Sequence, residues 1–179
     1  MRRCEECGFD WDSTGDEVIT EIDRWPASYR AGLTRLLPGE DGEALVRTRP
    51  APLVWSALEY TVHMRDVSRF YLERIQRVLA EDRPVMEAAD FTAMAENRNY
   101  NDEDVEDALG AFSDLAVTSS TLLTSLEPNH WQRTGIGNEG DERTVLTLAR
   151  RLAHDGHHHL LDVGRVLRTV RQARRPRPD

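Results

Sequence analysis

The sequence predicts an all-α protein, a four-helix bundle with long connections and a short N-terminal knuckle. Apolar residues recur at steps of three and four in four long segments, which is the period of a helix with one buried face. No segment alternates apolar and polar residues as a half-buried strand does. Two connections between the segments are long and carry proline or glycine. Four helices that each bury one face are expected to pack as a bundle.

Length and composition limit the classes of function. The 179 residues fit one bundle at 13–172, with a knuckle appended at 1–12 and a basic tail at 173–179. The net charge of −9 argues against a nucleic-acid partner, because binding phosphates requires excess Lys and Arg. No apolar run is long enough to cross a membrane. No apolar signal-peptide core follows the first three residues, so we expect a cytoplasmic protein.

The first two helices are expected at residues 16–37 and 53–80. Pro26 lies inside the first and predicts a kink or break. A proline-bearing loop from Pro38 to Pro52 separates them. In the second helix His63 shares a face with apolar residues, so its side chain is expected to point inward.

The last two helices are expected on either side of a glycine-rich loop. Residues 81–100 form a long connection with room for one short helix. Asn101 is the expected N-cap of the third helix, which ends before Pro128. After a loop at 129–142, the fourth helix runs from about 144 to 171.

The fourth helix carries four of the six histidines, in the run His154 to Asp162. Two pairs there have the i, i+4 spacing that lets both side chains reach one ion: Asp155 with His159, and His154 with His158. The first pair falls on or beside the apolar face, and the second points the opposite way. A buried aspartate or histidine needs a partner, so the first pair requires an explanation.

One metal site is predicted from His63, Asp155 and His159. Two imidazoles and one carboxylate leave coordination positions open for water or substrate, which is the pattern of a catalytic metal. Asp162, one turn after His159, is placed to orient its ring. The alternative is three unrelated polar residues that hydrogen bonds satisfy.

A second metal site is predicted from the only two cysteines. Cys4 and Cys7 form a Cys-x-x-Cys followed by glycine, and with His154 and His158 they make the ligand set of a closed structural zinc site. The N-terminal segment would have to fold back on the fourth helix. The alternatives are an exposed redox dithiol and a disordered tail. His154 and His158 would then be surface residues or an alternative pair for His63.

The motif Trp55-Ser56-x6-His63, followed by Asp155-x3-His159-x2-Asp162, resembles the DinB/YfiT-like superfamily, which includes the mycothiol-dependent maleylpyruvate isomerases. The likeness spans residues 16–170, and the N-terminal Cys-x-x-Cys looks like an actinobacterial branch. The chain has Asp155 where that family has Glu or His.

The resemblance implies a divalent metal, Zn²⁺ or Ni²⁺, and chemistry with a low-molecular-weight thiol such as mycothiol. It favours a metal-dependent thiol S-transferase or isomerase, with a small-molecule substrate and a thiol as partners. A non-enzymatic metal-binding bundle, structural or partner-binding, is the alternative, and a homodimer stays open. Candidate substrate contacts, each otherwise ordinary packing or solvation, are Glu59, Tyr60, Trp131 and Arg133.

Overall fold

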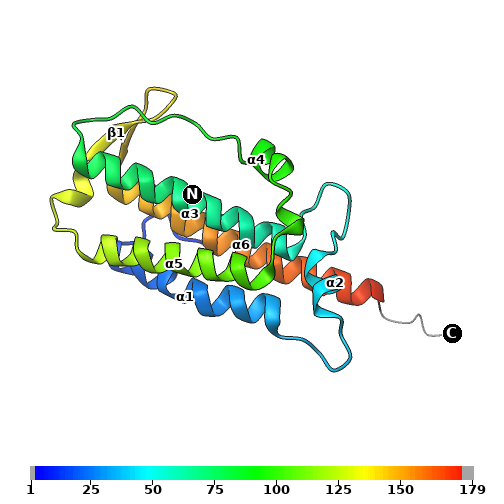
Figure 1. Cartoon of the computed structure of the whole chain (residues 1–179). Helices are drawn as coiled ribbons and strands as arrows, with labels where there is room; N and C mark the ends of the chain where they lie inside the picture. Colours follow the sequence, from blue (N-terminus) through cyan, green and yellow to red (C-terminus); the bar gives the residue numbers. More distant parts are fainter. Residues whose placement is uncertain (1–2, 175–179) are drawn as a thin grey trace.

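The protein is a bundle of four long helices, described here for residues 3–174 of a computed structural model (Figure 1). The long helices are α1 (Gly15–Thr34), α3 (Ala57–Ala80), α5 (Val105–Thr124) and α6 (Val145–Arg174). α1 and α6 run in one direction, and α3 and α5 run in the other (Figure 1). α1 and α3 each pack mainly against α5 and α6, so they lie diagonally across the bundle. The predicted fold class is confirmed.

Large aromatic residues fill the centre of the bundle. Trp25 and Tyr29 of α1 are fully buried and contact Phe112 of α5, with ring centroids 5.9 and 4.8 Å away. Tyr29 also donates a hydrogen bond of 2.8 Å to the carbonyl of Gly156 in α6. A Cβ at Gly156 would lie 2.2 Å from the Trp25 ring, so this glycine allows α1 and α6 to approach closely.

The predicted break at Pro26 is wrong, because α1 continues through it. A proline inside a helix costs about 3 kcal/mol. Burying each of the flanking Trp25 and Tyr29 side chains contributes about 4 kcal/mol or more, which offsets that cost. The packing of α1 therefore overrides the local preference of the chain.

Two predicted helix starts are displaced by side-chain caps. α3 begins at Ala57 and not near Leu53, because Ser56 and Glu59 form a reciprocal capping box. α5 is capped by Asp104 and not by the expected Asn101. Asn101 instead donates to the carbonyl of Arg47 and accepts a hydrogen bond from Ser56. It therefore ties two connections together at the start of α3.

The connections contain more structure than the sequence pattern predicts. The first holds α2 (Gly42–Arg47), and the second holds the expected short helix, α4 (Phe91–Asn97), followed by η1 (Tyr100–Asp102). The third holds η2 (His130–Gln132) and an antiparallel hairpin of β1 (Thr134–Ile136) and β2 (Glu142–Thr144). Strands of three residues are too short to show an alternating pattern, so the hairpin was not foreseen.

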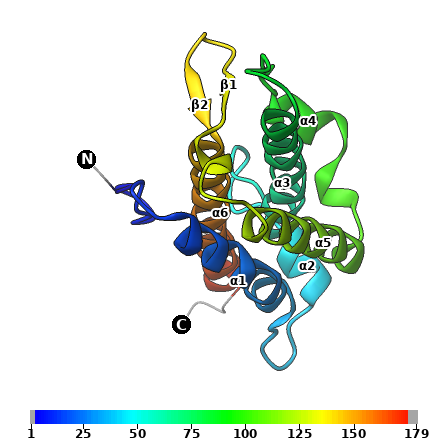
Figure 2. The same cartoon turned by 90° about the vertical axis from the view of Figure 1, so that its left-hand side faces the viewer.

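The two ends of the chain lie against the bundle differently. α6 extends to Arg174, so Ala173 and Arg174 of the predicted tail are helical, and residues 175–179 lie outside the described part. Arg171, near the end of α6, pairs with Glu40. The N-terminal segment lies outside the bundle beside α1 and α6 (Figure 2). Within the described residues, none of the helices is long and apolar enough to cross a membrane.

Candidate metal centre

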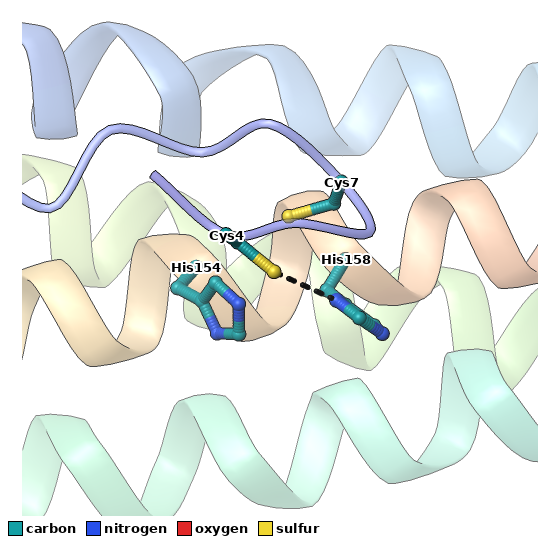
Figure 3. Close-up of side chains that lie close together, drawn as sticks. All are labelled: Cys4, Cys7, His154 and His158. Carbon is teal, nitrogen blue, oxygen red and sulfur yellow. Dashed lines mark hydrogen bonds between the residues drawn. The ribbon is translucent and has the colours of Figure 1, made fainter. Parts of the chain in front are cut away.

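The N-terminal segment, residues 3–12, folds into a tight knuckle. The amide of Cys4 donates to the carbonyl of Phe9, and the amide of Gly8 donates to the carbonyl of Cys4, both at 2.9 Å. Gly8 has a φ of +78°, a left-handed conformation that favours glycine. The turn brings the sulfurs of Cys4 and Cys7 close together above α6 (Figure 3).

Aromatic contacts hold this knuckle on α6. Phe9 is 7% exposed, and Trp11 stacks on the His154 ring at 4.5 Å between centroids. Arg150 of α6 donates a hydrogen bond of 2.7 Å to the carbonyl of Ser13. The segment is therefore anchored by apolar burial as well as by its polar groups.

The knuckle and α6 bring four donor groups together, Cys4, Cys7, His154 and His158, hereafter the Cys2His2 cluster. One ligand atom from each lies within 4.8 Å of all the others. Cys4 Sγ is 3.8 Å from His158 Nδ1 (Figure 3). In the described part of the chain this is the one group of three or more His, Cys, Asp or Glu side chains with the spacing of a metal site.

At least one carboxylate lies near a ring nitrogen of each histidine in the cluster. His154 Nδ1 is 3.1 Å from Asp155 Oδ1, and its Nε2 is buried without a hydrogen-bond partner. The hydrogen bond with Asp155 is the main cause that raises the pKa of His154. His158 Nε2 lies 3.7 Å from Asp162 and 3.6 Å from Glu6. Carboxylates in this position orient imidazoles and make them more basic ligands.

The two thiols differ in their electrostatic environment. The backbone amide of Cys7, followed by the imidazole of His154, lowers the pKa of the Cys4 thiol to about 6. Burial raises the pKa of the Cys7 thiol. Cys4 is therefore largely thiolate at neutral pH, and the thiolate is the form that binds metals and acts as a nucleophile.

A second group of histidines lies between α3 and another face of α6. The rings of His63 on α3 and His159 on α6, hereafter the imidazole pair, have centroids 4.9 Å apart. His159 Nδ1 is 3.0 Å from Asp162 Oδ2. His63 is 7% exposed, and its Nδ1 is buried without a hydrogen-bond partner. Burial, with a smaller effect of His159, lowers the pKa of His63 to about 3, so this ring is neutral at physiological pH.

The structure does not bring Asp155 to the imidazole pair. Its carboxylate binds His154 instead, and His63, Asp155 and His159 do not form a group with metal-ligand spacing among residues 3–174. Asp155 directly follows one cluster histidine, so a short rotation of its side chain suffices to reach that ring. The sequence could not show which neighbouring histidine it would bind.

The four candidate substrate residues are dispersed. Tyr60 lies beside the imidazole pair, 5.2 Å from His159 between ring centroids. Glu59 is 2% exposed and is occupied by Arg49 and by the capping box of α3. Trp131 packs against Gly15, and Arg133 donates to the carbonyls of Val78 and Glu81.

Arg133 thus caps the far end of α3, about 22 Å along the helix from His63. In this structure three of the four candidates have packing, ion-pair or capping contacts, whereas the ring of Tyr60 contacts the imidazole pair.

Two residues that stabilise the site, His157 and Trp11, belong to none of the sequence motifs named above. His157 Nδ1 lies 3.0 Å from Glu21 Oε1, and its Nε2 lies 3.1 Å from the carbonyl of Cys7. It links α1, α6 and the knuckle. Trp11 stacks on His154. The available signal was the pair of aromatic residues after Cys7, Phe9 and Trp11, because large aromatic side chains gain much free energy from burial.

The comparisons with known proteins agree with this architecture. The model of the DinB superfamily matches residues 16–163. Among solved structures, YfiT from Bacillus subtilis, described as a probable metal-dependent hydrolase with an unusual four-helix bundle topology, superposes with a TM-score of 0.77. The two sequences are 18% identical over 90% of this chain and 91% of that one. The comparison with curated proteins finds no match.

The family model covers most of the bundle, from the start of α1 to the middle of the histidine-bearing α6. It begins after the knuckle, so the family match says nothing of Cys4 and Cys7. The predicted family resemblance is confirmed for the bundle. The chain belongs to the DinB superfamily.

Proposed function

We propose that this DinB protein is a metal-dependent enzyme in which the imidazole pair holds a divalent ion, Zn²⁺ or Ni²⁺. The observation that carries the proposal is the buried Nδ1 of His63, which has no partner and belongs to a neutral ring beside His159. A buried ring nitrogen without a hydrogen bond is unfavourable unless something occupies it. A metal ion would satisfy it.

Two of the three predicted ligands, His63 and His159, are placed to bind such an ion. His63 is kept neutral by burial, and Asp162 holds Nδ1 of His159, which leaves Nε2 of that ring as its donor. Asp155 is the proposed third ligand, and its carboxylate must leave His154 to serve. A divalent ion bound there would lower the pKa of a coordinated water or thiol.

The chain's own residues would shape the reaction around that ion. Trp55 and Phe91 contact the His63 ring, at 4.9 and 5.3 Å between centroids, and limit its access to water. Tyr60, next to His159, would offer its hydroxyl to a bound substrate, because burial raises its pKa and keeps it protonated. Asp162 would fix the ring of His159.

The reaction class we propose is thiol S-transfer or isomerisation with a low-molecular-weight thiol, such as mycothiol, as co-substrate. The family resemblance supports the thiol, and the description of YfiT as a probable metal-dependent hydrolase supports a metal-held nucleophile. We place this activity in the cytoplasm, on a small-molecule substrate.

The test starts with metal content and an activity screen. The purified chain is freed of metal with a chelator, reloaded with Zn²⁺ or Ni²⁺, and assayed against panels of thiols, electrophiles and hydrolysable esters and amides. Activity that returns with metal and is lost in His63→Ala and His159→Ala supports the proposal. His130→Ala is the matched control, because His130 lies in η2, outside both histidine groups. Activity that survives loss of both imidazoles would overturn it.

A second candidate function is a bundle whose metal is structural only. The observation that favours it is the Cys2His2 cluster, which has four protein donors and thus no position open for substrate. This candidate predicts bound metal that is retained in His63→Ala and no metal-dependent turnover with any panel.

A further inference from the structure

We propose that Cys4, Cys7, His154 and His158 bind one Zn²⁺ ion in a closed tetrahedral site that fastens the N-terminal knuckle to α6. This site is separate from the imidazole pair and does not depend on any catalytic activity of the protein. The two cysteines of the site precede the residues that the family model matches, and its two histidines lie within them.

The chemistry of the donors selects the metal. Two thiolates and two imidazoles are the set that tetrahedral zinc prefers, whereas Ca²⁺ and Mg²⁺ prefer oxygen. The cysteines come from one turn of the knuckle and the histidines from one turn of α6, at i, i+3 and i, i+4. Each pair is thus presented by rigid local structure.

The distances are close to those that a bound ion requires. In a tetrahedral zinc site with normal bond lengths, neighbouring ligand atoms lie about 3.3 to 3.8 Å apart. Cys4 Sγ and His158 Nδ1 are already 3.8 Å apart, and no pair in the cluster exceeds 4.8 Å. Side-chain rotations that move these atoms by about 1 Å would complete the site.

Each histidine has one nitrogen for the metal and one for a carboxylate. His154 would bind through Nε2, which is buried without a partner, and this nitrogen is available to the metal whether Asp155 stays on Nδ1 or turns to the imidazole pair. His158 would bind through Nδ1, which faces Cys4, while Nε2 faces Asp162 and Glu6. This pattern of metal, imidazole and carboxylate is common in protein zinc sites.

The backbone of the knuckle supports the same assignment. The amides of Cys7 and Glu6 are directed at the Cys4 sulfur and, with the two histidines, stabilise its thiolate. His157 lies within hydrogen-bond distance of the carbonyl of Cys7 and so fixes the second cysteine. Trp11 covers the outer face of His154.

A redox dithiol is the main rival explanation of Cys-x-x-Cys. It accounts for the lowered pKa of Cys4, to which both histidines contribute, but it leaves the buried Nε2 of His154 without a hydrogen-bond partner. The zinc site explains all four side chains together. In a dithiol the two cysteines would react with alkylating agents whether or not a chelator were present.

Cobalt substitution tests the site in the full chain. The protein is reduced, freed of metal and titrated with Co²⁺, and the thiolate-to-cobalt charge-transfer band in the near ultraviolet is followed. We expect the band, with the strong visible absorption of tetrahedral cobalt, in the native chain and in His63→Ala. We expect its complete loss in Cys4→Ser/Cys7→Ser, with metal content lower by one ion per chain.

Thiol reactivity provides a readout that needs no variant. The chain has only two cysteines, so both should be protected in the zinc-loaded protein and both should react after chelation. Circular dichroism checks that the cysteine variant keeps its helices, and His130→Ala is the matched control for His63→Ala. The proposal is overturned if the native chain shows no thiolate-to-cobalt band, or if its thiols react equally fast with and without zinc.

Discussion

Two groups of histidines use side chains of α6 that lie within one turn of each other, and one group also uses His63 of α3, yet their surroundings differ. The Cys2His2 cluster has four donors, two of them from a knuckle outside the bundle, and it leaves no open position. The imidazole pair has two donors from two core helices and a buried nitrogen without a partner. The first arrangement suits a structural ion and the second suits an exchangeable one.

The difference follows from helix geometry. His158 and His159 are consecutive, so their side chains leave α6 about 100° apart. His158 points to the knuckle and His159 points to α3. A run of histidines in a helix can therefore serve two sites, and it is wrong to assign the whole run to one ion.

Asp162 connects the two groups. Its carboxylate lies 3.0 Å from His159 Nδ1 and 3.7 Å from His158 Nε2. Burial raises the pKa of Asp162, but the hydrogen bond with His159 and the smaller effects of its other neighbours outweigh burial, and the net pKa is lowered. The carboxylate is thus ionised and able to orient both rings.

The largest effect is expected from Gly156→Ala, which forces α1 and α6 apart in the part of α6 that carries the histidines. Gly156→Ala places a methyl group 2.2 Å from the Trp25 ring, so the helices must move apart. We expect a loss of about 3 kcal/mol in the free energy of unfolding, measured by urea denaturation. Gly164→Ala is the control, because no atom lies within 4 Å of its Cβ. It should stabilise the protein by about 0.5 to 1 kcal/mol. Equal effects of the two substitutions would refute this role of Gly156.

A slightly smaller effect on the free energy of unfolding is expected at Asp66, a buried carboxylate near the imidazole pair. Asp66, close to His63 on α3, is 4% exposed and accepts hydrogen bonds from Arg65, Arg98 and Tyr100. Asp66→Asn removes a buried charge from these partners and should cost about 2 to 3 kcal/mol in urea denaturation. The exposed Asp114→Asn on α5 should change stability by less than about 0.5 kcal/mol.

The effect of Asp66 should depend on pH. Burial raises the pKa of Asp66, but the hydrogen bonds from Tyr100 and Arg65 lower it by more than burial raises it. The net shift of the pKa is therefore downward. A carboxyl with a lowered folded pKa stabilises the protein above its unfolded pKa of about 3.9, and this contribution is lost as pH falls through the folded pKa. The stability difference between native and Asp66→Asn should therefore shrink below about pH 4. A difference that grows on acidification would contradict this assignment.

The smallest effect is expected at Trp11, whose ring stacks on a histidine of the cluster, and it concerns the affinity for metal. Trp11→Ala removes the ring stacked on His154, an interaction that contributes about 1 kcal/mol. We expect the dissociation constant for Co²⁺ at the cluster to rise about fivefold, with no change in metal binding to the imidazole pair. A loss of affinity at both groups would show that Trp11 acts on the whole fold.

The sequence was sufficient where periodic apolar residues determine the structure. The stripes through Trp25, His63, Phe112 and Leu148 predict the four long helices, and the second also predicts the inward direction of His63. The spacing of two cysteines and two histidines also predicted which four donors meet. The apolar stripes depend on local geometry, which the sequence contains, whereas the meeting of the four donors was predicted from the ligand chemistry of zinc alone.

The sequence was insufficient where one side chain has several accessible partners. Asp155 has a histidine on the same face one turn later and another directly before it, and tertiary contacts decide between them. Arg133 was predicted to contact the substrate. It directly precedes β1, however, and donates a hydrogen bond to the carbonyl of Val78 near the end of α3. Asp104, not Asn101, caps α5, because the side-chain amide of Asn101 donates a hydrogen bond to the carbonyl of Arg47.

The central claim is that the cluster binds zinc with two sulfurs and two nitrogens, independently of the imidazole pair. X-ray absorption at the zinc edge tests it most directly, on a His63→Ala/His159→Ala variant loaded with one equivalent of Zn²⁺. The account predicts two sulfur neighbours at about 2.3 Å and two nitrogen neighbours at about 2.0 to 2.1 Å. A first shell of nitrogen and oxygen alone, or the absence of bound zinc in this variant, would contradict it.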